Sequence, residues 1–349
     1  MRIAIEKIDL MLRSARPKAF TGCASRSTRS IAPRGLLRPP LRAGFAAAAL
    51  LAAALVAAGG APAAAQSLES LGFRPFFAEP SPTMKVQLRP VVRPADALPD
   101  GQPAFGYGRI AEAWLVAPTE RYDHGVLGDA VEAGGLMVRL RDGGERRLLL
   151  PESQVFEDLQ PRLADLDGDG EDEILVVRSS LDAGAVLTVY GLVGDDLRLI
   201  AEGPDHLPRH RWLNPVGAAD FDGDGVVEVA YVETPHLGGI LRILSLQDGR
   251  LIEEASWAGF SNHLIGSREL GLSAILDFDE DGLPEIILPS ARRRSIRVMR
   301  YADGELKLLG RDFYDAQIVG DFRLEDLDGN GMDEVIFQLD DGLEVRLYR

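Results

Sequence analysis

Four acidic segments of one pattern, spaced at nearly constant intervals, constrain the fold of this chain most. Each reads D-x-D-x-(D/N)-G-x-x-E, and they begin at Asp165, Asp220, Asp277 and Asp326. Each leads into a short apolar run with strand character, such as Ile174–Val177. The final glutamates of successive segments are 55, 57 and 49 residues apart. That period is too long for most helical solenoids and is typical of a four-stranded β-propeller blade.

A fifth unit without an acidic segment precedes these four. The run Glu112–Val116 resembles the strand-like run Glu228–Val232, and Leu136–Leu140 reads as the next strand. Gly106-Tyr107-Gly108 stands where the aspartates would be. The sequence therefore predicts an all-β fold, a β-propeller of about five four-stranded blades, with six or seven blades as the alternative.

The last unit is one strand short of a complete blade. It offers three strand-like runs, within residues 317–347. Because an unpaired sheet edge invites pairing, we expect an N-terminal strand, Met84–Val92, to close the ring. Residues 66–83 and 93–105 are rich in Pro and Ala and are expected to be linker or loop. The propeller domain then spans residues 106–349.

Residues 1–65 have the three parts of an export signal. They hold ten Lys and Arg against two acids, and an uncharged apolar stretch, Phe45–Ala58, follows. Ala63-Ala64-Ala65 then provides a cleavage site before Gln66. Two alternatives stay open: an organelle transit peptide, or an uncleaved membrane anchor, although 14 apolar residues are short of the ~20 that span a bilayer. We expect a periplasmic or secreted protein.

The charge of the remaining chain excludes some partners. The formal net charge of the whole chain is −16, but residues 66–349 hold 28 basic and 52 acidic residues, a net of −24. Nucleic acids and anionic membranes are bound by clustered Lys and Arg, so neither is an expected partner of this region. Membrane contact would come only from an uncleaved anchor. The single cysteine, Cys23, lies in the N-terminal segment, which leaves residues 66–349 without thiol chemistry.

The acidic segments have the composition of calcium sites. In each, the side chains at positions 1, 3, 5 and 9 and the backbone carbonyl at position 7 can converge on an ion. Such a dense set of oxygens suits Ca²⁺, which takes 6–8 oxygen ligands, better than Zn²⁺ or Cu²⁺. A helix–loop–helix site is excluded because position 12, which needs a carboxylate, is Val176, Tyr231, Leu288 or Phe337. The alternative is a set of Asp/Gly turns without metal. The predicted ligands of about four Ca²⁺ are Asp165, Asp167, Asp169, Glu171, Glu173, Asp220, Asp222, Asp224, Val226, Glu228, Asp277, Asp279, Asp281, Leu283, Glu285, Asp326, Asp328, Asn330, Met332 and Glu334.

These loops with their following strands resemble the FG-GAP/VCBS repeats of integrin-α-type β-propellers, over roughly residues 106–349. The stretches Arg121–Asp129, Arg211–Pro215 and Ser261–Ser267 also resemble bacterial secreted VCBS-repeat proteins. The resemblance implies that each acidic loop joins the first and second strands of a blade and binds Ca²⁺. Integrin propellers have seven blades, whereas five units are found here, so the resemblance implies little about a ligand.

The remaining polar and aromatic residues are expected to share the other face of the propeller. In a four-stranded blade the first and third turns lie on one face, and the second turns and the connectors between blades lie on the other. All five histidines, including His206, fall in second turns or connectors. These side chains could instead cap blade junctions, and no H-x-H spacing supports a three-histidine transition-metal site. The expected ligand-binding face comprises Arg121, His124, His210, Arg211, Trp212, Asn214, Glu233, His236, Asn262, His263, Arg268 and Arg292.

Two classes of function fit this sequence. The first is a non-catalytic, calcium-binding propeller that binds a protein or glycan outside the cytoplasm. The second is a hydrolase acting on sugar or phosphate esters at the histidine-rich face. Catalysis would need a carboxylate pair or a nucleophile with its base, and neither G-x-S-x-G nor H-E-x-x-H occurs. We favour binding and assign no catalytic residue. Convergence of Glu233 and a second acid with His236 and His263 in one pocket would favour the enzyme.

Overall fold

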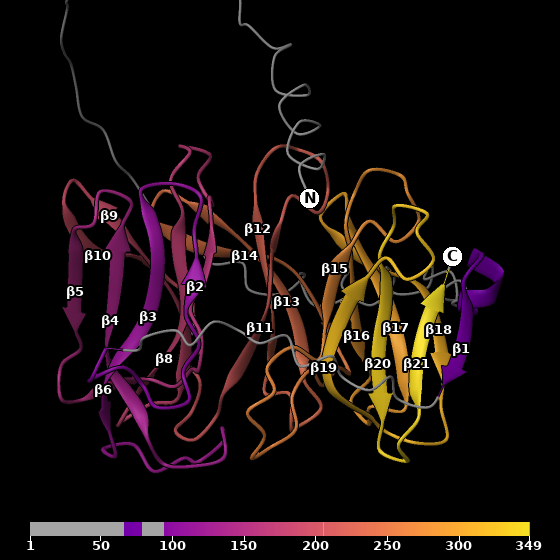
Figure 1. Ribbon diagram of the computed structural model, residues 1–349, viewed down its shortest axis with the longest axis horizontal. Coiled ribbons are helices and arrows are strands. Elements are labelled where there is room, and N and C mark those ends of the chain that lie inside the picture. Colours follow the sequence, from indigo (N-terminus) through magenta and orange to yellow (C-terminus); the bar gives the residue numbers. More distant parts are fainter. Residues whose placement is uncertain (1–65, 79–93, 205, 349) are drawn as a thin grey trace, which may run out of the picture. The chain divides into compact units, whose positions relative to one another are not determined.

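The computed structural model describes residues 66–78, 94–204 and 206–348. The predicted export signal and the predicted strand Met84–Val92 therefore lie outside the described residues. Within the described ranges, no helix is long and apolar enough to cross a membrane. The regular structure is almost entirely antiparallel β-sheet (Figure 1). This confirms the predicted all-β class.

Two consecutive sheets consist of four strands in sequence order, each joined to the next by a hairpin. Their strands are β11 (Leu213–Ala219), β12 (Glu228–Glu233), β13 (Ile240–Gln247) and β14 (Arg250–Ala258), then β15 (Ala274–Leu276), β16 (Glu285–Pro289), β17 (Ser295–Ala302) and β18 (Glu305–Phe313). The hairpin turn Asp248–Gly249 has both residues in the left-handed conformation, as an Asp-Gly turn requires. In the third unit the sequence predicts four strands, and each end agrees with the structure to within three residues. The predicted ranges are Val216–Ala219, Val227–Val232, Ile240–Leu246 and Leu251–Ser256.

The first two units have the same plan but share one nine-stranded sheet. A short strand, β6, pairs with both β4 and β8 and so joins them. The strands are β2 (Ala104–Phe105), β3 (Ile110–Thr119), β4 (Glu132–Leu140), β5 (Glu145–Leu149), β6 (Gln154–Phe156), β7 (Arg162–Ala164), β8 (Glu173–Ser180), β9 (Ala185–Val193) and β10 (Asp196–Glu202). The segment 93–105, predicted as linker or loop, thus ends in a strand.

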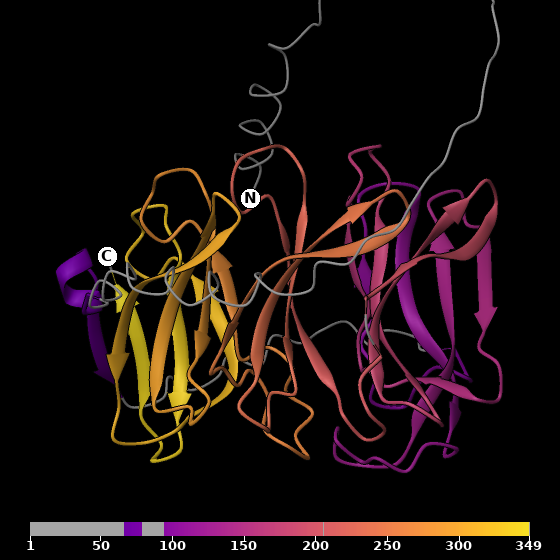
Figure 2. The same cartoon turned by 180° about the vertical axis from the view of Figure 1, so that it is seen from behind.

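The C-terminal sheet is completed by an N-terminal strand, β1 (Arg74–Ala78), which pairs antiparallel with β21 (Figure 2). An N-terminal strand was expected there, but β1 lies within residues 66–83, which were predicted to be linker. The sequence signal is weak because β1 is an edge strand with its two phenylalanines half exposed, and Pro75 can be accommodated at an edge. The other strands are β19 (Ile318–Glu325), β20 (Glu334–Leu339) and β21 (Glu344–Tyr348), and the 3-10 helix η2 (Leu68–Leu71) precedes β1.

The hydrophobic core lies between neighbouring sheets. The second strand of each unit has a central apolar run that is buried on both faces, such as Ile286–Leu288 in β16, a strand in which all five residues are buried. Neighbouring sheets contact one another along their first strands, β11 with β15 and β15 with β19. They also contact along their last strands, β10 with β14 and β14 with β18. The connection between the first and second strands therefore lies at an equivalent place in every unit. The four acidic loops are these connections in the second to fifth units.

Candidate metal loops, central pocket and histidine cluster

Each acidic loop folds into the same tight turn between the first and second strands of its unit. In the first, second and fourth loops the aspartate at position 1 holds the turn, because its two carboxylate oxygens accept backbone N–H groups from positions 4 and 6. In the third loop, of these two groups, Asp277 accepts only the N–H of Gly282, at position 6. Asp165 accepts from Gly168 at 2.8 Å and Gly170 at 3.0 Å. Asp220 and Asp326 accept the corresponding pairs at 2.7–3.0 Å. The turn is thus made locally, from residues within one loop.

Two positions of the turn need the left-handed backbone conformation. Position 6 is glycine in all four loops, with φ near 90°. Position 4 is left-handed too, and three loops have glycine there. The third loop has Glu280 instead, with φ of 60°, so a non-glycine residue bears the strain at that point.

The glutamate at position 9 of each loop is buried and points back into its own turn. Glu173 Oε2 accepts the backbone N–H of Leu166 at 2.9 Å, and Glu228 accepts that of Phe221 at 3.0 Å. This leaves Oε1 of Glu173 and Oε1 of Glu228 available to an ion. Three groups of carboxylates have ligand atoms within 4.8 Å of one another: Asp165, Asp167 and Glu173; Asp220, Asp222 and Glu228; and Asp277, Asp279 and Glu285.

The electrostatics of these groups favour a cation. Burial, together with repulsion from the loop aspartates led by Asp167, raises the pKa of Glu173 to about 7. Burial and the same repulsion raise the pKa of Glu228 to about 7. A divalent ion would relieve both effects. The donor set consists of hard oxygens alone, which fits Ca²⁺.

The third loop differs because an arginine from β17 enters it. Arg300 contacts Asp279 at 2.7 Å, Asp281 at 2.9 Å and Glu285 at 2.5 Å. This guanidinium supplies one positive charge where the first two loops have none. Two buried oxygens, Asp277 Oδ1 and Asp279 Oδ1, still lack a hydrogen-bond partner. The third loop is therefore partly neutralised by the protein itself, and sequence spacing gave no sign of this.

The fourth loop keeps the turn but not a compact carboxylate group. Its Asp326, Asp328 and Asn330 are exposed, and Asn330 replaces a carboxylate with an amide. Among the described residues, the groups that could hold a metal ion come from the first three loops. Three of the four predicted calcium loops therefore contain a carboxylate group that could hold an ion, and the predicted number of four ions is not confirmed.

The acid-free first unit carries a second arginine in the equivalent place. Arg139 on β4 is directly opposite Glu112 on β3, and their side chains meet at 2.6 Å. The backbone N–H groups of Tyr107 and Gly108 bond to Asp172, which belongs to the next acidic loop. In the first and fourth units a guanidinium thus meets the glutamate at the start of the second strand.

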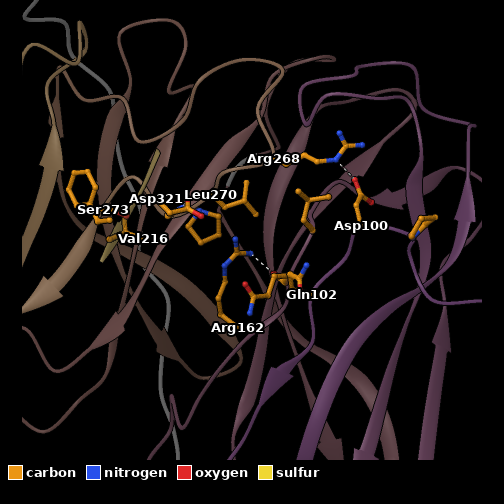
Figure 3. Close-up of a pocket in the computed structure, with 14 residues that line it drawn as sticks. Asp100, Gln102, Arg162, Val216, Arg268, Leu270, Ser273 and Asp321 are labelled. Atoms are coloured by element: carbon orange, nitrogen blue, oxygen red, sulfur yellow. Dashed lines mark hydrogen bonds and ion pairs between the residues drawn. The ribbon is translucent and has the colours of Figure 1, made fainter. Parts of the chain in front are cut away.

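A cavity of about 720 Å³ is lined by residues from all five units. Figure 3 shows Arg268 and Asp100 at one end, Asp321 and Ser273 at the other, and Arg162 with Gln102 between them. The cations in this cavity are paired: Arg268 with Asp100 at 2.5 Å, and Arg162 with the buried Asp158 at 2.5 Å. The wall is completed by Pro99, Leu159, Gln160, Pro215, Val216, Leu270, Gly271 and Phe322.

A smaller cavity, of about 160 Å³, brings histidines together from separate loops. His124, from the second turn of the first unit, places Nδ1 2.5 Å from Glu157 Oε1. His210, from a connector, lies against it, with ring centroids 5.2 Å apart. His236, from a later second turn, stacks on Trp212. Four of the chain's histidines gather here when the buried His263 behind His236 is included.

The neighbours of this cluster are themselves buried and bonded. Glu157 is fully buried, and Ser179 Oγ donates to its second oxygen at 2.5 Å. His236 Nε2 lies 2.8 Å from His263 Nδ1, and His263 Nε2 lies 3.0 Å from the carbonyl of Ser267. Burial lowers the pKa of His236 to about 4 and that of His263 to about 3, so both are neutral at pH 7. Glu157 was missed in the sequence because it lies 33 residues from His124.

Several predicted ligand-face residues serve as internal supports instead. The side-chain amides of Asn214 and Asn262 are buried, and each donates to the other's backbone carbonyl. Glu233 pairs with Arg242 at 2.6 Å and does not line the histidine cavity. Arg121 donates to the carbonyl of Gln154 at 2.8 Å. Arg268 lines the large cavity, and Arg292 lines a separate one beside Phe313.

Glu132, at the start of β4, is a buried acid with a testable effect on stability. Burial raises its pKa to about 9, and Glu157 adds repulsion. The pKa of Glu132 in the folded protein is higher than its value near 4.5 in the unfolded chain. The contribution of this carboxyl group to the free energy of unfolding is therefore fully present below pH 4.5 and is lost as the pH rises toward 9. We expect Glu132→Gln to stabilise the protein by roughly 3 kcal/mol at pH 7.

Urea unfolding at pH 4 and pH 8 measures this effect. The gain of Glu132→Gln should be present at pH 8 and absent at pH 4, while the exposed control Glu120→Gln should change little at either pH. An equal difference at both pH values would contradict a neutral, buried Glu132.

Comparison with known proteins adds little to this geometry. No protein-family model matches the chain, and no curated protein matches it. Among solved structures, it is similar to the rhamnogalacturonan lyase YesW, with 16% identity over 60% of this chain and a TM-score of 0.38. It is similar to a Bacillus licheniformis rhamnogalacturonan lyase with 15% identity over 58% of this chain and the same TM-score. The match spans about half the length of each lyase, at 49% and 47%. A likeness this distant carries no argument about activity.

Proposed function

We propose that the chain is a calcium-stabilised five-bladed β-propeller that acts as a binding module outside the cytoplasm. Three four-stranded sheets and one nine-stranded sheet that combines two units support the blade count, and the pairing of β1 with β21 supports closure through an N-terminal strand. The FG-GAP/VCBS-like loops support calcium. The proposed site of action rests on the signal-like composition of residues 1–65.

The observation that carries the binding proposal is the large cavity shared by all five units (Figure 3). At about 720 Å³ it lies within the range of small-molecule and oligosaccharide sites. Its wall is rich in amide, hydroxyl and carboxylate groups, such as Gln102, Ser273 and Asp321. Because both lining arginines are already paired with carboxylates, the cavity suits a ligand with many hydroxyl groups better than a highly charged one. We therefore propose a glycan as the ligand.

The hydrolase alternative is less well supported. Glu233 is committed to Arg242, and His263 is buried in a hydrogen-bonded chain, so the acid and histidines that catalysis would need do not converge. A binding module does not need Glu233 and the histidines to converge, so their positions agree with binding without catalysis.

An immobilised panel of neutral and acidic oligosaccharides tests the proposal. We expect the calcium-loaded protein to retain at least one of them, and Ser273→Trp, which fills the cavity, to weaken retention at least tenfold. Ser256→Trp is the matched control, because Ser256 is exposed on the outer strand β14. Absence of retention by the wild type, or equal retention by both variants, would overturn the glycan proposal. Release of shortened sugars from the panel would instead favour the hydrolase.

A further inference from the structure

We propose that the cavity beside Phe313 binds a tetrahedral oxyanion group of the phosphate or sulfate type. This cavity measures about 420 Å³ and lies at the turn between β16 and β17. Three arginines and two serines line it, and the described residues of its wall include no aspartate or glutamate. It shares no lining residue with the large cavity, so the proposal does not rest on the glycan function.

The three arginines of this cavity, Arg292, Arg294 and Arg297, have no carboxylate partner in the part of the chain that the structure describes. In the large cavity, by contrast, Arg162 and Arg268 are each paired with an aspartate. Residues 66–349 hold 52 acids against 28 bases, so acidic partners are abundant in this protein. A group of arginines that meets none of them keeps a positive charge that an anionic ligand can neutralise.

The register of β17 and β18 adds a fourth arginine to this place. Arg297 on β17 is directly opposite Arg311 on β18, and like charges in that position destabilise a sheet. The guanidinium of Arg311 lies over the ring of Phe313, 5.2 Å from its centroid. Burial, and then repulsion from Arg311, lowers the pKa of Arg297. An oxyanion in the adjoining cavity would offset this repulsion.

The Arg297 side chain is fixed in position by the protein but is not neutralised by it. Its guanidinium packs over Phe260, with Cζ 5.1 Å from the ring centroid, and Nη1 donates to the carbonyl of Gly259 at 3.2 Å. Its Nε is buried and has no hydrogen-bond partner among the described residues. A buried donor left unpaired costs free energy, and a guanidinium has five N–H groups to satisfy. Arg297 is therefore a preorganised cation with donors that the protein does not use.

The chemistry of the cavity selects the class of ligand. Guanidinium groups bind phosphate, sulfate and carboxylate through paired hydrogen bonds, and several of them together suit a dianion better than a single carboxylate. The carboxylates of the third acidic loop do not line this cavity, because Glu285 begins β16 whereas the arginines follow its end at Pro289. Phe313, which is largely exposed at the wall, offers an apolar surface to the organic part of an ester. The oxyanion could thus be free or carried on a sugar.

Calorimetric titration with inorganic sulfate and with galactose 6-sulfate tests the site. Ca²⁺ is kept in excess, and chloride holds the ionic strength constant and low, because salt screens exposed charges. We expect the wild type to bind one equivalent, and Arg297→Gln to weaken binding at least tenfold. The matched control is Arg250→Gln, which removes the same charge from an exposed position at the start of β14 and should leave the affinity unchanged.

Melting curves identify whether Arg297→Gln still folds. A double variant, Arg292→Gln with Arg294→Gln, changes only exposed side chains and should also weaken binding at least tenfold. Unchanged binding in this double variant would overturn the proposal, as would the absence of binding by the wild type or an equal loss in Arg250→Gln.

The two titrants distinguish the sources of the oxyanion. Tighter binding of galactose 6-sulfate than of sulfate supports a site for an ester, and equal affinities support a site for the free ion. Ser273→Trp, which fills the large cavity, should bind sulfate as the wild type does. If it does not, the anion lies in the large cavity and the present proposal fails, whereas loss of glycan retention alone leaves it standing.

Discussion

Removing calcium is expected to lower the melting temperature of the protein by roughly 10–20 °C. An ion present at 100 times its dissociation constant stabilises the folded state by about 2.7 kcal/mol per site, so the first two loops together contribute roughly 5 kcal/mol. In a chain of this size each kcal/mol moves the melting temperature by about 2–4 °C. The physical cause is the burial of Glu173 and Glu228 beside the loop aspartates, which raises the pKa of both glutamates and which a bound ion would offset.

Melting in EDTA and then in excess Ca²⁺ measures this difference. Replacing both Asp222 and Asp224 with Ala should remove about one bound ion and part of the shift, because each loop makes its own turn from its own residues. Equal melting temperatures in EDTA and Ca²⁺ would contradict structural calcium. Simultaneous loss of all ions in the double variant would show that the loops do not bind independently.

Replacing Arg300 with Gln is expected to make the third loop depend on calcium. Without Ca²⁺ the change should cost about 3 kcal/mol, because it leaves the fully buried Glu285 and its neighbouring aspartates without their cation. With Ca²⁺ most of that loss should be recovered, since the ion can then take the charge that the guanidinium held. The variant should also bind calcium more tightly at this loop than the wild type does.

The matched control is Arg242→Gln in the preceding sheet. Arg242 likewise joins two carboxylates, Glu233 and Glu253, but no acidic loop is involved. Its cost should be the same with and without Ca²⁺. Chemical unfolding of both variants in EDTA and in Ca²⁺ makes the comparison. If Ca²⁺ fails to rescue Arg300→Gln, or rescues both variants equally, Arg300 is not a substitute for an ion.

Local features of this protein could be predicted from the sequence alone. The acidic turns are made by hydrogen bonds that span seven residues or fewer, as between Asp165 and Gly170 or Leu166 and Glu173, so their spacing and glycine pattern determine them. The strands of the third and last units follow from apolar runs between turn residues. Burial of the apolar run Ile286–Leu288 in β16 likewise follows from its sequence.

Long-range pairings could be decided only by the tertiary structure. Arg300 reaches the third loop because the pairing of β16 with β17 sets it beside Glu285, and no local pattern encodes that register. The strand β1 is an exposed edge strand whose partner, β21, lies some 270 residues away. Glu157 became visible as the partner of His124 only when two loops were brought together. Short-range turns are set by the residues within them, whereas the cation in the third loop and the histidine cavity depend on contacts that form only when the sheets pack.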